Sequence, residues 1–315
     1  MKTFIKRVGR RVAWVALMMG AGVFSAAGQT PDSGMAVAAS IMPLADFARQ
    51  VGGERVTVTV LVPPGAEPHS FSLRPGQMKT LQRAGVLVLN GLGLEPWGER
   101  VAAAAGNPRL KIVRAGEGLP GGPSGGHDAH GGHPHDESLE SDPDHNPHVW
   151  MDPLLAIEMA AKIRDGFIQA DPAGREVYQH NWAGFKSRLE KIHRTYQQVL
   201  GPGGWEMGGR LMVSFHAGVV HLAKRYGLRN LTVLEGGSEK EPSPTRLADV
   251  IREIRDKGVK VVFHEPQFSR KAVDILAEES GTKVVVLDTL GRDEPNSYSV
   301  MMGANLYNLA SALGH

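Results

Sequence analysis

Histidine is concentrated in one short stretch of the chain. Six of the 13 histidines lie between residues 125 and 150, in the sequence HDAHGGHPHDESLESDPDHNPHVWMDP. Neutral imidazole is a common ligand for Zn²⁺ and similar ions, and closely spaced histidines raise the local ligand concentration. The composition therefore predicts a segment that handles metal. The alternative is a solvated loop whose histidines are incidental.

The overall composition narrows the kind of metal site and of partner. The chain has 315 residues, no cysteine and a formal net charge of +2. Without cysteine there are no disulfides and no thiolate ligands, so a metal must be held by nitrogen and oxygen donors. A balance so close to neutral gives no indication of nucleic-acid binding.

The first 28 residues have the composition of a secretory signal peptide. A basic segment is followed by the uncharged apolar stretch Val12–Phe24 and by the small residues Ser25–Ala27. We therefore expect residues 1–28 to direct export to the periplasm, with Arg10–Arg11 leaving a twin-arginine route open. No later segment approaches the ~20 apolar residues that a membrane span needs.

Short apolar runs alternate with helical patterns along the rest of the chain. A helix is clearest over Ser243–Gly258, which has a capping serine, proline at its first position and glycine after its end. This alternation predicts an α/β fold with largely parallel sheets. The predicted strands are Val37–Ile41, Val56–Val62, Val86–Leu89, Leu211–Phe215, Leu231–Leu234, Val259–Phe263 and Lys283–Leu287.

One long helix interrupts the alternation and divides the chain. Over Pro172–Leu200, large apolar residues recur at alternating steps of four and three, which indicates a helix with one buried face. We predict two doubly wound α/β lobes joined by this rigid helix. The predicted units are an N-terminal lobe over 35–170 with a histidine-rich loop over 116–145, a connecting helix over 171–200, and a C-terminal lobe over 201–315.

Four possible ligands lie at or near the ends of these predicted elements. His69, His216 and Asp288 follow predicted strands, and His148 lies in the loop sequence NPHVW. Ligands of open α/β sheets bind beyond the carboxyl ends of the strands, so these side chains can converge. Three imidazoles and one carboxylate would complete a tetrahedral Zn²⁺ shell. Spacing alone leaves open that the histidines are surface or core residues and that Asp288 caps a turn.

Several motifs, in order along the mature chain, resemble the zinc/manganese solute-binding proteins of ABC importers, of the periplasmic high-affinity zinc-binding type. They are PPGAEPHSFSLRPGQMKTLQRAGVLVLNGLGLEPW, NPHVWMDP, SFHAGVVHLAKRYGL and HEPQFSRKAVDILAEESGTKVVVLDTLG. The resemblance implies two α/β lobes that hold the ion in an interlobe cleft and present it to a membrane permease. It implies that the metal ligands of the family correspond to His69, His148, His216 and Asp288. It further implies a monomeric transport protein and no enzyme activity.

The resemblance also bears on the choice of metal. Manganese-selective members tend to have a carboxylate where this chain has His216, and imidazole suits Zn²⁺ whereas Mn²⁺ prefers oxygen. We therefore expect Zn²⁺. Glu67 and His264 are auxiliary candidates, as a ligand or as a partner of one. The family often continues with Asp and an aromatic residue after Phe215-His216, whereas this chain has Ala217-Gly218-Val219.

The histidine tract calls for a second, weaker kind of site, because a flexible backbone cannot preorganise a ligand shell. We expect the tract to buffer zinc or to relay it to the cleft. Its candidate ligands are His127, His130, His133, His135 and His145.

Three other functions remain open at this point. They are a manganese-binding importer component, a metal-dependent adhesion or sequestration protein on the same fold, and a secreted zinc hydrolase. The hydrolase is disfavoured because no HExxH motif is present and four protein ligands leave no open coordination position.

Overall fold

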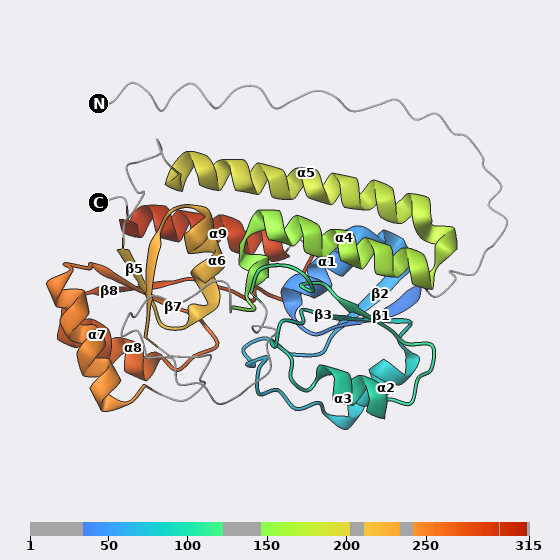
Figure 1. Ribbon diagram of the computed structural model, residues 1–315, viewed down its shortest axis with the longest axis horizontal. Helices are drawn as coiled ribbons and strands as arrows, with labels where there is room; N and C mark the ends of the chain where they lie inside the picture. Colours follow the sequence, from blue (N-terminus) through green and yellow to red (C-terminus); the bar gives the residue numbers. More distant parts are fainter. Residues whose placement is uncertain (1–33, 122–145, 202–210, 234–241, 296, 314–315) are drawn as a thin grey trace, which may run out of the picture. The chain divides into compact units, whose positions relative to one another are not determined.

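The computed structural model describes residues 34–121, 146–201, 211–233, 242–295 and 297–313. The predicted signal peptide and the five tract histidines lie outside these ranges. Within them, strands and helices alternate around two parallel sheets, so the predicted α/β class is confirmed (Figure 1).

The N-terminal lobe is built on a four-stranded parallel sheet in the order β2-β1-β3-β4. Its strands are β1 (Met35–Ala39), β2 (Val56–Val60), β3 (Val86–Leu89) and β4 (Lys111–Arg114). Its helices are α1 (Met42–Gly52), α2 (Pro75–Arg83), α3 (Gly98–Ala104) and α4 (Pro153–Ala170). Every residue of β3 is buried, as expected for an apolar strand covered on both faces. β4 is not among the predicted strands, because only two of its four residues are apolar.

The C-terminal lobe repeats this arrangement, with the strand order β6-β5-β7-β8 and parallel pairing throughout. Its strands are β5 (Leu211–Ser214), β6 (Arg229–Thr232), β7 (Val261–His264) and β8 (Lys283–Val286). Its helices are α6 (Val220–Arg225), α7 (Pro244–Asp256), α8 (Arg270–Ser280) and α9 (Ser297–Leu313). The predicted start of α7 is confirmed, because the Ser243 hydroxyl accepts a hydrogen bond from the backbone N–H of Arg246.

In each lobe the first strand lies between the second and the third. Connections that leave the adjacent strands β1 and β3 therefore run in opposite directions across the sheet, and the same holds for β5 and β7. Such switch points open a crevice at the carboxyl ends of the strands, where ligands of α/β proteins bind.

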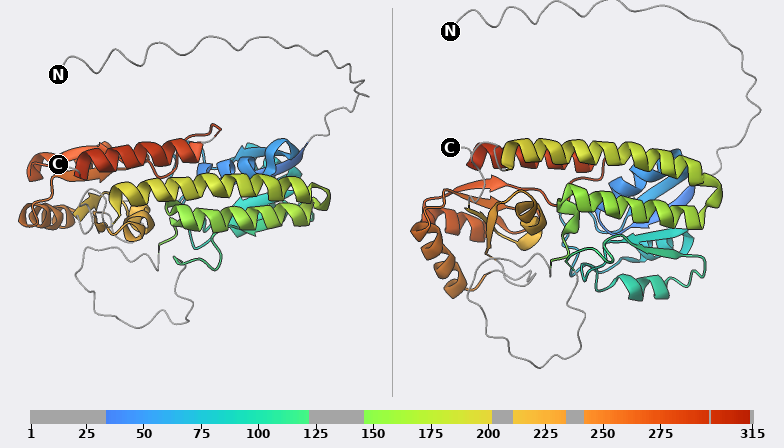
Figure 2. Two further views of the ribbon diagram at one scale, coloured as in Figure 1. Left: turned by 90° about the horizontal axis from the view of Figure 1, so that it is seen from above. Right: turned by 45° about the horizontal axis from the view of Figure 1, so that its top comes forward.

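The connecting helix is α5 (Arg175–Leu200), which packs against α4, α1 and α9 (Figures 1 and 2). The sequence placed its start at Pro172, but Pro172–Gly174 forms a separate 3₁₀ turn, η4. Tyr178, Phe185 and Tyr196 of the predicted apolar face are buried. This apolar face is therefore part of the hydrophobic core, as the helical spacing of its residues predicted.

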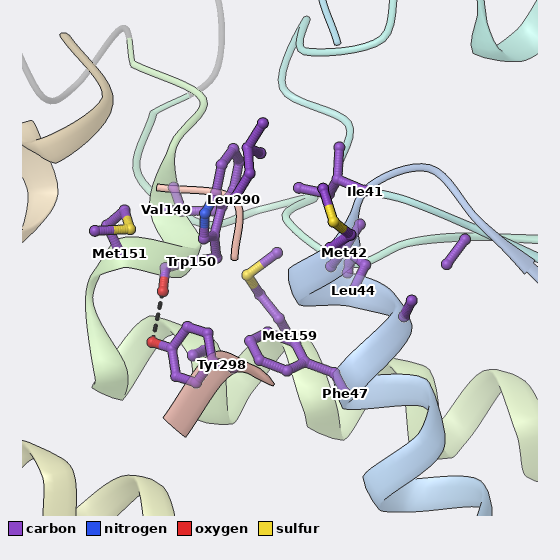
Figure 3. Close-up of a cluster of buried hydrophobic side chains, with 14 of the residues drawn as sticks. Ile41, Met42, Leu44, Phe47, Val149, Trp150, Met151, Met159, Leu290 and Tyr298 are labelled. Atoms are coloured by element: carbon purple, nitrogen blue, oxygen red, sulfur yellow. Dashed lines mark hydrogen bonds between the residues drawn. The ribbon is translucent and has the colours of Figure 1, made fainter. Parts of the chain in front are cut away.

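A hydrophobic core shared by both lobes surrounds Trp150, in the 3₁₀ turn η3 (Val149–Met151) (Figure 3). The indole Nε1 donates a hydrogen bond of 2.7 Å to the carbonyl of Thr289, and the Tyr298 hydroxyl donates one of 2.7 Å to the carbonyl of Trp150. Both partners belong to the C-terminal half of the chain. The segment that follows His148 is therefore fixed to the second lobe.

None of the described helices is long and apolar enough to cross a bilayer.

Candidate metal centre

Three of the four predicted ligands converge. One ring nitrogen each of His69, His148 and His216 lies within 4.8 Å of the other two. Their ring centroids are 4.7 Å apart for His148 and His216, 5.6 Å for His69 and His148, and 6.3 Å for His69 and His216. His69 lies in the loop between β2 and α2, His148 directly before η3, and His216 between β5 and the 3₁₀ turn η5 (Ala217–Val219).

His148 is held by its own loop. Asn146 Oδ1 lies 2.9 Å from the ring Nδ1 and also accepts a hydrogen bond of 3.0 Å from the backbone N–H of His148. Because an amide oxygen only accepts, Nδ1 carries the proton and Nε2 keeps its lone pair. The Asn146 amide nitrogen donates across the lobes to the carbonyl of Ala217, at 2.9 Å. Burial, and then the charge that His216 can carry, hold the pKa of His148 well below its usual value.

His216 is equally buried but has a charged partner. Its Nδ1 lies 3.4 Å from the carboxylate of Glu265, which follows β7. Burial alone would lower the pKa of His216, but the charge of Glu265 and its hydrogen bond outweigh burial and raise it. The two buried imidazoles thus have opposite pKa shifts although their rings are neighbours.

His69 has an unsatisfied ring nitrogen. Among the described residues, its buried Nε2 has no hydrogen-bond partner, and Oε1 of Glu67 lies 3.9 Å away. Burial, and then the charge that His216 can carry, lower the pKa of His69 to about 4. At neutral pH the imidazole is therefore uncharged. A neutral imidazole with a buried nitrogen that lacks a partner is available to bind a metal.

The loop that carries His69 is held from the side of α3. The Trp97 indole Nε1 donates a hydrogen bond of 2.8 Å to the carbonyl of Pro68, and the Phe71 ring packs edge-on against Trp97 at 5.9 Å. His69, Phe71 and Trp97 also line a cavity of about 520 Å³. His69 is thus the ligand candidate that borders this cavity.

Asp288, Glu67 and His264 lie outside the group of three among the described residues. Asp288 Oδ1 accepts hydrogen bonds from the backbone N–H groups of Leu290, at 3.0 Å, and Gly291, at 2.8 Å. Its carboxylate therefore shapes the loop after β8. The His264 ring is buried beside Phe215, with its centroid 6.4 Å away, and its Nδ1 has no partner.

Sequence reasoning assigned no role to two residues of the site, Asn146 and Glu265. Each touches the Nδ1 atom of a clustered histidine. A signal for Glu265 was available, because a carboxylate directly after a buried strand lies at the same sheet edge as His216. Asn146, two residues before His148, has the spacing of a side-chain cap on a following backbone N–H.

The arrangement can hold a borderline divalent ion. Three imidazoles that are buried or nearly so provide nitrogen donors, two with Nδ1 held by an oxygen and one with Nε2 unpaired. Zn²⁺ binds imidazole nitrogen at about 2.0–2.1 Å in tetrahedral sites, whereas oxygen-rich shells suit Mn²⁺. The residues present therefore fit zinc as a bound cargo.

Comparisons with known proteins identify the family of this chain. Residues 37–312 match the family described as zinc-uptake complex component A, periplasmic. The chain is 27% identical over 285 residues to the high-affinity zinc uptake system protein ZnuA of Bacillus subtilis, covering 88% of this chain and 87% of that protein. A crystal structure of ZnuA superposes with a TM-score of 0.75 at 29% identity, covering 89% of this chain and 100% of the other.

A longer relative is the zinc-binding lipoprotein AdcA of Streptococcus pneumoniae. It is 26% identical over 264 residues, and the match covers 82% of this chain but only 50% of AdcA. The family match, in contrast, extends over nearly the whole described chain. The protein belongs to the family of the periplasmic zinc-uptake complex component A.

Proposed function

We propose that this protein is a periplasmic solute-binding component that captures Zn²⁺ and delivers it to the permease of an ABC importer. The observation that carries the proposal is the convergence of three imidazoles within 4.8 Å, one of them with a buried, unpaired Nε2. Buried polar atoms normally find a partner, so an unpaired ring nitrogen on one of three converging imidazoles favours a metal between them.

The proposed ligands are His69, His148 and His216, with Asp288 as the fourth. The hydrogen bonds that fix Asp288 use its Oδ1 atom. A carboxylate has about four acceptor positions, so the group can bind a metal through Oδ2 and keep its loop contacts. Glu67, whose Oε1 is 3.9 Å from His69 Nε2, is the competing fourth ligand. Four protein ligands would leave no position for a reactive water, which supports transport over catalysis.

Zinc is the proposed cargo in preference to manganese. The donor set holds three imidazoles, and a carboxylate at position 216 would be the change that favours Mn²⁺. The names of the B. subtilis and S. pneumoniae relatives, which specify zinc, support the same choice.

The histidine tract is the proposed auxiliary zinc-capturing segment. His127, His130, His133, His135 and His145 would bind ions weakly and pass them to the three-histidine group. Export through the signal peptide over residues 1–28 would place both sites in the periplasm, where the family description also places component A. The permease partner follows from membership of an uptake complex.

Competition between Zn²⁺ and Mn²⁺ tests the proposal. The mature chain, its His216→Ala variant and a variant lacking residues 122–144 would each be titrated against a chromophoric chelator, with bound metal counted by elemental analysis. We expect one tight zinc in the parent and in the deletion variant, no tight zinc in His216→Ala, and loss of only the weak zincs on deletion. His180→Ala, which removes an exposed imidazole of α5, is the matched control.

Two outcomes would contradict the proposal. Tight manganese with weak zinc would overturn the choice of cargo, and tight zinc retained by His216→Ala would overturn the site. A deletion variant that keeps every weak zinc would remove the role of the tract.

A further inference from the structure

A buried carboxylate lies behind the metal-binding group and touches only one of its histidines. Glu265 follows β7, and its side chain is 1% exposed. Burying an ionised carboxylate costs several kcal/mol unless hydrogen-bond donors surround it. The donors around Glu265 therefore indicate what the residue does.

Glu265 Oε2 has two fixed donors and also lies 3.4 Å from Nδ1 of His216. The Thr289 hydroxyl donates to it at 2.8 Å and the Gln267 side-chain amide at 3.1 Å. Oε1 is buried and also lies 3.4 Å from that Nδ1, but among the described residues it has no partner with hydrogen-bond geometry. A proton on Nδ1 would be donated to Oε2 and would leave Nε2 of the same ring with its lone pair.

Gly218 lies beside the Glu265 carboxylate, and its lack of a side chain leaves room for the contact between Glu265 and His216. A Cβ atom on Gly218 would lie 2.5 Å from Glu265 Oε2 and 3.0 Å from the Thr289 methyl group. A side chain at 218 would therefore require the carboxylate or its surroundings to shift. Gly218 lies in the segment after His216 where the sequence departs from the pattern common in the family.

We infer that Glu265 is a positioning residue, which accepts the Nδ1–H of His216, fixes the tautomer that presents Nε2 to the metal, and supplies a negative charge behind three neutral imidazoles. Outer partners of this kind raise the basicity of a ligating histidine and fix its orientation. His148 receives orientation alone, because its partner Asn146 is neutral. The effect of Glu265 on zinc affinity rests on the proposed zinc site, whereas its effect on the tautomer of His216 does not.

The test uses two readouts on the full chain. Long-range ¹⁵N–¹H spectra of the metal-free protein at pH 8 report which nitrogen of His216 carries the proton, and chelator competition reports zinc affinity. Glu265→Ala should lose the fixed Nδ1–H tautomer and bind zinc about 10–100-fold more weakly. Glu265→Gln keeps an accepting oxygen, so it should keep the tautomer and lose affinity by a smaller factor, through the lost charge alone.

Gly218→Ala is a second route to the same result if Glu265→Ala does not fold. It keeps the carboxylate but displaces it, so it should loosen the tautomer and weaken zinc binding. The matched control is Glu278→Gln, the same chemical change at an exposed position of α8, which should alter neither readout.

Different outcomes separate the two proposals. An Nε2–H tautomer in the parent chain, or a Glu265→Ala variant that is folded and keeps both the tautomer and the affinity, overturns the role of Glu265. A parent chain that shows the Nδ1–H tautomer, loses it in Glu265→Ala, and yet binds no zinc tightly supports the contact and overturns the proposed cargo instead.

Discussion

The two segments that bring buried histidines to the site hold them in different ways. In the N-terminal lobe, the segment 146–152 orients His148 through the neutral amide of Asn146 and is fixed to the other lobe through Trp150. In the C-terminal lobe, the segment 214–219 orients His216 through the carboxylate of Glu265. Each of the two imidazole rings is thus oriented by an acceptor at Nδ1, but only His216 has a charged acceptor. The first segment joins the lobes, and the second is the one that we propose tunes the metal.

Removing Trp150 should have the largest effect, because it breaks the first segment at its fixed point. Trp150→Ala deletes a fully buried indole and its hydrogen bond to Thr289. Such truncations cost about 3–5 kcal/mol. Urea unfolding of the metal-free protein should show this loss, whereas Tyr307→Ala, which truncates an exposed aromatic residue of α9, provides the control. A loss below about 1 kcal/mol would mean that Trp150 does not join the lobes.

Removing the imidazole of the first segment should abolish tight binding as fully as removing that of the second. For His148→Ala we expect zinc affinity to fall more than about 100-fold, beyond the range for outer partners, because a ligand is lost. Chelator competition at pH 7.5 measures this, with His180→Ala as control. Retained affinity in His148→Ala alone would show that the segments are not equivalent as ligand sources.

Lowering the pH should reduce the stability of the metal-free protein through His69. Any contribution of His216 to the change in stability should have the opposite sign. The folded-state pKa of His69 is about 4, below the value near ~6.5 of an unfolded chain. The unfolded chain therefore binds the extra proton, and stability falls as pH drops from about 6.5 toward 4. The raised pKa of His216 favours the protonated folded state instead.

The contribution of His69 to this loss of stability can be measured by comparing the parent chain with a variant that lacks the imidazole. Lowering the pH from 7 to 5 should cost about 2 kcal/mol through His69 alone. Urea unfolding at the two pH values should show a drop that is smaller by about this amount in His69→Gln, whereas the exposed His180→Gln should match the parent. An identical drop in His69→Gln would contradict the neutral, buried state of His69.

Removing the neutral partner should have the smallest effect. Asn146→Ala takes the acceptor from His148 Nδ1 and the interlobe hydrogen bond to Ala217. We expect a loss of about tenfold in zinc affinity, near the lower end for an outer partner, because no charge is removed. A loss larger than that of Glu265→Ala would reverse the distinction between the two segments.

The sequence predicted the α/β class and the long helix, because both rest on local patterns. The three histidines that converge were expected from strand ends together with the family resemblance, since spacing alone left other roles open. The sequence did not predict which side chains face the histidines. The strand predicted to end at Phe263 continues to His264, so the position of Glu265 depends on the true strand end. Whether Asp288 caps its loop or binds metal depends on a small movement of one carboxylate, which spacing does not encode.

X-ray absorption spectroscopy of the zinc-loaded chain lacking residues 122–144 tests the central claim most directly. At one equivalent of zinc, the account predicts three imidazole ligands at about 2.0–2.1 Å and one oxygen at about 2.0–2.2 Å. His216→Ala should then show two imidazoles at most. A parent spectrum with fewer than three imidazoles, or one dominated by oxygen, would contradict the three-histidine zinc site.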